Sequence, residues 1–106
     1  MANASNFTIT LKNSTDAEIK ATKFEYKDGT KWETENLFGL DGFKKIEKDH
    51  SFPFTRTLQG VGDEGTCFKV TYKHHIGGTT WSTDKVETTA PFVCHDNGSK
   101  IVTLTK

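Results

Sequence analysis

The stretch CFKVTYK, residues 67–73, gives the clearest indication of the fold. Phe68, Val70 and Tyr72 share one parity, and mostly polar or charged residues lie between them. Side chains of a strand point alternately to its two faces, so this period of two predicts a strand with one buried and one solvated face. The stretch FTITLK, residues 7–12, has the same pattern and predicts another such strand.

A further strand is predicted over residues 17–27, with a change of phase inside it. Its apolar residues switch from odd to even positions along the strand: Ile19 and Ala21, then Phe24 and Tyr26. One extra residue in a strand moves all later side chains to the opposite face, which is the effect of a β-bulge. We therefore expect a bulge near Thr22-Lys23.

Shorter strands are predicted over residues 31–35, 43–46, 51–58, 80–86, 92–94 and 101–104. Turn-forming pairs rich in Gly, Asp and Asn separate them, and residues 36–42 and 60–65 are expected to be loops. Threonine occurs 17 times and phenylalanine 8 times, a composition that favours strands. Eight or nine short strands at spacings of roughly 10 residues predict one antiparallel β-sandwich domain over residues 1–106, of jelly-roll or Greek-key type.

The charge balance argues against nucleic acid as the partner. The chain has 106 residues, with 14 Lys plus Arg and 14 Asp plus Glu, so its formal net charge is +0. A neutral chain lacks the long-range field expected of a duplex-binding protein. No apolar run is long enough to span a membrane, and no signal peptide is visible.

Cys67 and Cys94 are the only cysteines, and both fall in predicted strands. We predict a disulfide between them, which would stabilise the fold by roughly 3 kcal/mol; two free thiols and metal ligation are the alternatives. A disulfide favours an extracellular or cell-surface location, whereas the lack of a visible signal peptide keeps the cytoplasm open.

No motif for nucleophilic catalysis or phosphate binding is present, and we expect the protein not to be an enzyme. Its histidines match no zinc-ligand spacing, and the adjacent His74 and His75 point to opposite faces of a strand. We expect no cofactor and no metal. Calcium bound by loop aspartates stays open as an alternative, because turns place four of them beside or near glycine: Asp28, Asp41, Asp63 and Asp96.

Two tryptophans are the candidate binding residues. Sugar recognition needs an aromatic face for the C–H side of the ring and polar groups for the hydroxyls. The first predicted site is the hairpin around Trp81, whose glycines let a ligand approach the backbone: His75, Gly77, Gly78, Thr79, Thr80 and Trp81. The second is the turn with Asp28, Lys31 and Trp32. The alternative for both tryptophans is a place in the sandwich core.

The stretch FTITLKNST at residues 7–15, followed by DGTKW at residues 28–32, resembles the start of aegerolysin-type jelly-roll proteins. The chain is shorter than those proteins and lacks their tryptophan-rich second half. In size, paired cysteines and all-β character it is similar to the small slime-mould haemagglutinins of the Physarum type. That resemblance implies recognition of cell-surface glycans without catalysis.

The sequence therefore predicts a carbohydrate-binding lectin for the glycans of cell-surface glycoproteins. The alternatives are an aegerolysin-like protein that binds lipid or perforates membranes, and an interaction module without a small ligand. Agglutination of cells requires two sites per chain or a homodimer, because one site cannot cross-link.

Overall fold

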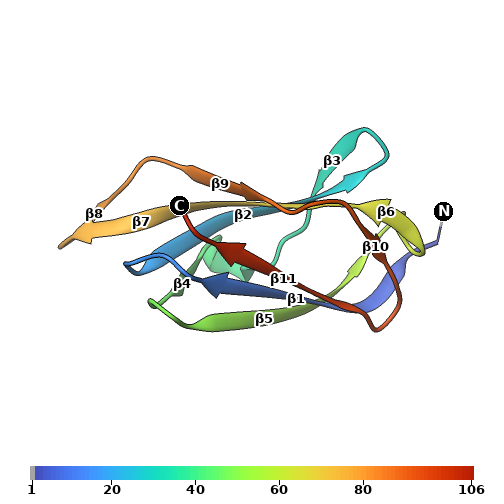
Figure 1. Cartoon of the computed structure of the whole chain (residues 1–106), viewed down its shortest axis with the longest axis horizontal. Coiled ribbons are helices and arrows are strands. Elements are labelled where there is room, and N and C mark those ends of the chain that lie inside the picture. The colour runs from blue at the N-terminus through green and yellow to red at the C-terminus, as the bar shows by residue number, and fades with distance from the viewer. Residues whose placement is uncertain (1) are drawn as a thin grey trace.

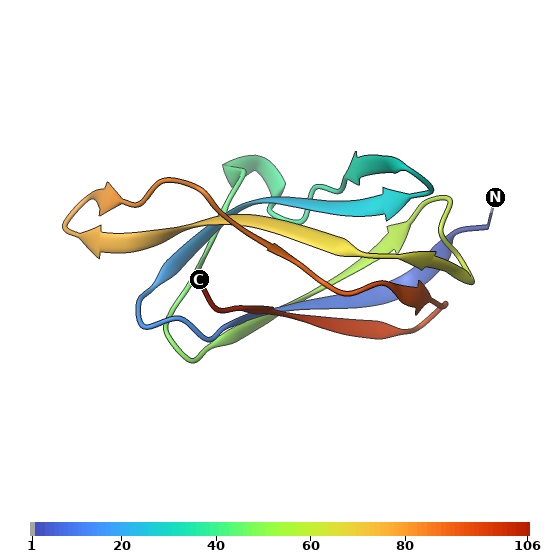
Figure 2. The same cartoon turned by 45° about the horizontal axis from the view of Figure 1, so that its top comes forward.

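The computed structural model describes residues 2–106 and confirms the all-β sandwich. The chain is 60% strand and 3% helix, and it folds into two facing layers about 45 Å long (Figure 1). Figure 2 shows the larger sheet above and the smaller sheet below. No helix among the described residues is long and apolar enough to cross a membrane.

The larger sheet is built around the antiparallel pair β2 (Ile19–Asp28) and β7 (Phe68–Gly77). Each of these long strands has two short strands in tandem along its other edge. Along β2 these are β3 (Lys31–Thr34) and β4 (Lys44–Ile46). Along β7 they are β8 (Thr80–Trp81) and β9 (Lys85–Thr88).

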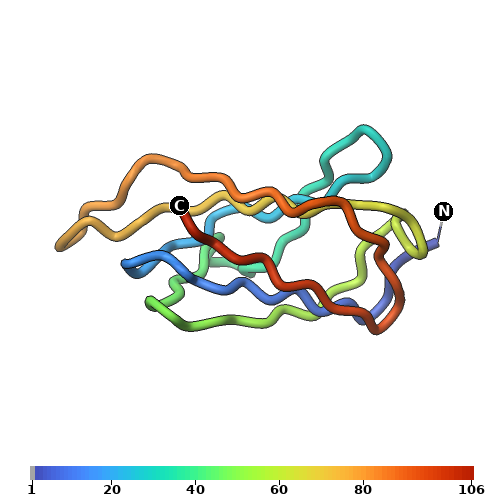
Figure 3. Tube along the Cα trace, viewed as in Figure 1, coloured from blue at the N-terminus to red at the C-terminus, as the bar shows by residue number. Residues whose placement is uncertain are grey.

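The smaller sheet has β1 (Ala4–Asn13) at its centre. β5 (Ser51–Leu58) pairs with β1 antiparallel, whereas β11 (Ser99–Leu104) pairs with it parallel. The first and last strands therefore run side by side in the same direction (Figure 3). The sandwich is not purely antiparallel, because the chain returns through the other layer before β11 forms.

Three aromatic rings join the layers in the core. Phe68 from β7 meets Phe24 of β2 at a ring-centroid distance of 4.9 Å and Phe7 of β1 at 5.8 Å, both edge to face. All three rings are buried. Edge-to-face pairs add about 0.5–1.5 kcal/mol each beyond the area they bury, so this cluster fixes the position of β1 against the larger sheet.

The predicted bulge is confirmed. Ala21 pairs with Tyr72 and Lys23 pairs with Thr71, so Thr22 is the extra residue of β2. As a result, Ala21 and Phe24 both face the core although their positions differ in parity.

Eleven strands lie within the described residues, more than the eight or nine expected. The expected strand over residues 80–86 is split into β8 and β9, because the Ser82 hydroxyl accepts the His74 amide hydrogen at 2.9 Å and replaces a ladder carbonyl. A short ribbon of β6 (Glu64–Thr66) and β10 (Phe92–Cys94) closes one end. β6 begins in the expected loop and is too short to show a period. Residues 39–41 form one turn of 3₁₀ helix, η1.

The predicted disulfide is wrong, since Cys67 and Cys94 are both free. Cys94 pairs with Glu64 across the β6–β10 ribbon. Cys67 lies three positions beyond Glu64, about 10 Å along the chain, and a disulfide allows a Cα separation of only about 4.4–6.8 Å. The odd offset also directs the two side chains to opposite faces. Without this disulfide, the cysteines no longer favour an oxidising compartment.

Deletion of Thr22 tests the importance of the bulge for the fold. Without the extra residue, Phe24 and Tyr26 can no longer face the core while Ile19 and Ala21 also do. We expect a loss of at least about 3 kcal/mol in the free energy of unfolding, as for truncation of a core aromatic residue. Urea unfolding measures it, with Thr22→Ser as the matched control at full length. Wild-type stability of the deletion variant would contradict this role.

Candidate functional site

Both tryptophans lie on the outer, solvated face of the larger sheet. Trp81 pairs with His75 of β7, and Trp32 pairs with Lys27 of β2. Both pairs have the parity opposite to the buried Phe68 and Tyr26. The two tryptophans are partly exposed and lie outside the core, which excludes the structural alternative considered for them.

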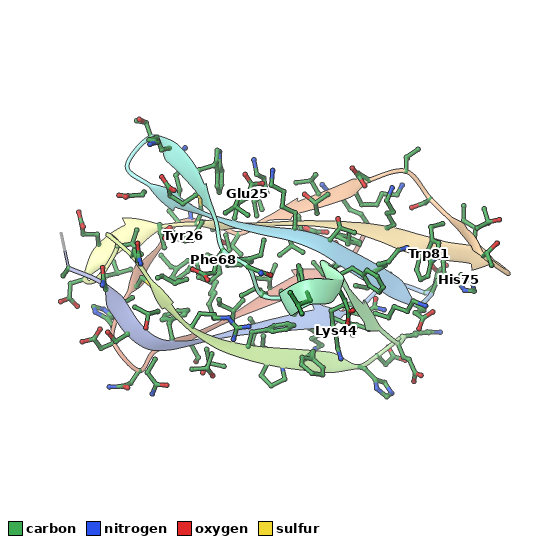
Figure 4. All side chains as sticks on the ribbon, turned by 180° about the vertical axis from the view of Figure 1, so that it is seen from behind. Glu25, Tyr26, Lys44, Phe68, His75 and Trp81 are labelled. Carbon is green, nitrogen blue, oxygen red and sulfur yellow. The ribbon has the colours of Figure 1, made fainter. Side chains whose placement is uncertain are left out.

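Trp81 is surrounded by positively charged and aromatic groups. Its ring centroid lies 4.9 Å from that of His75, and the Lys20 ammonium lies 4.6 Å from the indole. The Lys45 ammonium, from β4, lies 5.7 Å away. Figure 4 shows His75 and Trp81 together at the far end of the sheet. The predicted hairpin is thus joined by two lysines from other strands.

The tip of this hairpin is exposed, as expected. Gly77, Gly78, Thr79 and Thr80 all face solvent. Gly78 has a positive φ of 57°, which a side chain would strain. The His75 Nε2–H donates to the Gly78 carbonyl at 2.7 Å, so this nitrogen braces the turn and leaves Nδ1 for a ligand.

The second predicted group is divided by the strand pleat. Asp28 and Lys31 pair with each other one position away from Trp32, so their side chains point to the opposite face. The Lys31 ammonium instead lies 3.7 Å from the Glu33 carboxylate. The cations beside Trp32 are Lys69, at 4.2 Å from the ring centroid, and Lys27, at 5.5 Å.

Asp28 lines a separate cleft of about 380 Å³ with Asn3, Tyr26, Glu33, Gln59 and Gly60. Burial raises the pKa of Tyr26, and the nearby carboxylates of Glu35, Glu33 and Asp28 raise it further. This edge of the molecule is therefore acidic.

The outer face, by contrast, is basic. Its strand residues include six lysines: Lys20, Lys23, Lys27, Lys45, Lys69 and Lys73. Glu25 lies between Lys23 and Lys69, at 3.8 and 3.7 Å, and Asp84 lies 3.1 Å from Lys73. None of the ion pairs within residues 2–106 involves Lys20, Lys27 or Lys45. The neutral total charge thus conceals a strong separation of charge between surfaces.

The loop aspartates do not converge on a common point. Asp63 accepts a hydrogen bond from His95 at 2.8 Å, and Asp96 accepts one from the Ser5 amide at 2.8 Å. Among the described residues, no group of three or more His, Cys, Asp or Glu side chains is placed to hold a metal ion.

The lysines beside the tryptophans were not identified from the sequence. Lys69 alternates with the core residues of β7. Lys20 and Lys27 differ in parity, so they lie on the same face of β2 only because the bulge falls between them. That alternation is the signal that could have placed them. Their pairing with a particular tryptophan depends on strand register, which the sequence does not show.

Comparison with known proteins found no matching family, no similar curated protein and no similar solved structure. The resemblance to slime-mould haemagglutinins and aegerolysins therefore stays a hypothesis, and the site has to be interpreted from its own chemistry.

The charge around the tryptophans predicts how ions quench their fluorescence. Iodide should quench more strongly than caesium, each relative to N-acetyltryptophanamide, because lysines concentrate anions at both rings. The double variant Lys20→Gln/Lys69→Gln should lose most of this difference. Lys12→Gln/Lys48→Gln, at exposed lysines off this face, should retain it. Equal relative quenching of the wild type by the two ions would contradict the arrangement.

Proposed function

We propose that the protein is a non-catalytic carbohydrate-binding protein, a lectin, with binding sites at Trp81 and Trp32. One observation carries this proposal: two partly exposed indole rings lie on one solvated sheet face, and neither contributes to the core. Aromatic rings are usually buried, so a pair left on an open polar surface favours a role in binding.

The Trp81 site offers the groups that a sugar needs. The indole presents an apolar surface for the C–H side of a pyranose, and the exposed Thr79 of the turn offers a hydroxyl for its hydroxyl groups. Thr80 comes one position before Trp81 in β8, so its side chain points to the opposite face. Gly77 and Gly78 leave the backbone open nearby.

The environment of Cys94 makes this residue unsuited to act as a catalytic nucleophile. Burial, with a smaller effect of Asp96, raises the pKa of the Cys94 thiol to about 11. Such a thiol stays protonated at neutral pH and is a poor nucleophile.

Two sites on one chain would make a single molecule bivalent. Such a chain could bridge two cells without forming a dimer, which would allow a small protein to agglutinate them. A homodimer remains the other route to the same valency.

Lipid binding is the second candidate function, and a different surface favours it. Leu40 in η1 is fully exposed, and the rings of Phe43 and Phe52 are partly exposed. The Lys44 ammonium lies 3.9 Å from the Phe52 centroid, and that of Lys20 lies 5.3 Å from the Phe43 centroid. Apolar side chains flanked by lysines suit an anionic bilayer surface.

A glycan array followed by calorimetry with the best free sugar tests the lectin proposal. Trp81→Ala should weaken sugar binding at the hairpin at least about tenfold, as expected for a binding hot spot, so that calorimetry detects only the Trp32 site. Its unfolding free energy should fall only modestly, because the ring is outside the core. Trp81→Phe is the matched control and should keep part of the affinity. The alanine variant should also lose agglutination while binding through Trp32. A folded alanine variant that still binds sugar at two sites per chain with full affinity would remove this hairpin from the site.

Sedimentation with protein-free liposomes tests the second candidate. If lipid binding is the function, the wild type pellets with phosphatidylserine vesicles, and Leu40→Glu/Phe43→Glu does not. Trp32→Ala, which leaves the apolar surface intact, should then behave as wild type. We expect that the wild type does not pellet. If the wild type pellets and only the glutamate variant fails to do so, lipid binding would replace the lectin proposal.

A further inference from the structure

We infer that the outer face of the larger sheet binds one extended acidic polysaccharide, carrying sulfate or carboxylate groups, which contacts both tryptophans at once. This inference rests on the proposed function and names its ligand class. It joins the two predicted sites into one continuous surface, so agglutination through such a ligand would require a homodimer.

The two ends of this face are built in the same way. Trp81 has the ammonium groups of Lys20 and Lys45 at 4.6 and 5.7 Å. Trp32 has those of Lys69 and Lys27 at 4.2 and 5.5 Å. An ammonium over a ring is held by a cation–π attraction of only about 0.5–1 kcal/mol at an exposed site. It is therefore free to move onto a stronger anionic partner while the ring receives the sugar.

The lysines at the tryptophans have unused charge. Lys20 and Lys45 at one end, and Lys27 at the other, take part in none of the ion pairs found within residues 2–106. A neutral sugar would leave these charges unmatched, whereas a sulfate or carboxylate would form charge-assisted hydrogen bonds with them. Charge complementarity thus selects an acidic glycan over a neutral one.

The spacing of the ends indicates a linear ligand. From Lys69 beside Trp32 to His75 beside Trp81, β7 advances six residues without interruption, or about 20 Å. The carboxylates of Glu25 and Asp84 and the apolar Val86 also lie along this surface. Lysines and threonines occupy much of the rest: Lys23, Thr71, Lys73 and Thr88. A polymer lying along this strip would meet unpaired lysines near both tryptophans, and hydroxyls with ion-paired lysines between them.

Other polyanions fit the strip less well. Single-stranded nucleic acid is bound by stacking of successive bases on closely placed aromatic rings. Here the two indoles lie on β3 and β8, on opposite edges of the β2–β7 pair and near opposite ends of it. A bilayer requires apolar side chains directed into it, and the exposed Leu40 lies in η1 rather than on the strip.

Calorimetry with a heparin octasaccharide tests the inference, with the same octasaccharide after desulfation and N-acetylation as the reduced-charge probe. Heparin should bind at least about tenfold more tightly, and its affinity should fall steeply with salt. Lys20→Gln/Lys69→Gln should weaken heparin binding about tenfold or more. The matched control Lys12→Gln/Lys48→Gln has the same net charge and should stay within about twofold of the wild type.

The outcomes separate this inference from the proposed function. Trp81-dependent binding of neutral sugars, with no preference for heparin, would overturn the inference and leave the lectin proposal standing. Failure of every glycan to bind would overturn both. Equal weakening by the two lysine pairs would overturn the assignment to this face. A single-stranded oligonucleotide and phosphatidylserine vesicles are compared with heparin at the same salt concentration. If either binds more tightly than heparin and this binding is lost in the Lys20→Gln/Lys69→Gln variant, the glycan assignment would be overturned.

Discussion

The structure depends most on the single extra residue at Thr22 of β2. Before it, Ile19 and Ala21 face the core and Lys20 faces solvent; after it, the parity is reversed, and Phe24 and Tyr26 face the core. The bulge therefore lets both halves of β2 turn their apolar side chains to the core and their lysines to solvent. Because β2 contacts β3, β4 and β7, this parity orders the whole larger sheet.

The same constraint separates core from surface chemistry. On the inner side, Phe68 packs on Phe24 of its own sheet and on Phe7 of the smaller sheet, which joins the two layers. On the outer side, the register of β3 and β8 brings Trp32 and Trp81 beside lysines of β2 and β7. The proposed acidic-glycan surface is thus the reverse side of the core-forming strands. Its rigidity follows from the core, which favours a preformed binding surface.

Strand periodicity predicted much of the fold and little of the site. It predicted the bounds of β5 and β10 and the bulge, because these depend on alternation within one segment. The parallel pairing of β11 and the distance between the cysteines depend on which strands meet, and local pattern does not determine that. The Asp28–Trp32 site was predicted from sequence neighbours, which a strand places on opposite faces. The lysines of both sites come from other strands.

The most direct test of the account is a nuclear magnetic resonance titration that follows the indole N–H signals of Trp32 and Trp81. A heparin octasaccharide should shift both signals with one common dissociation constant, together with amides of β2 and β7. A heparin disaccharide is too short to reach from one tryptophan to the other, so it should bind more weakly and with separate constants. Shifts confined to β1, β5 and β11, with both indole signals unmoved, would contradict the account.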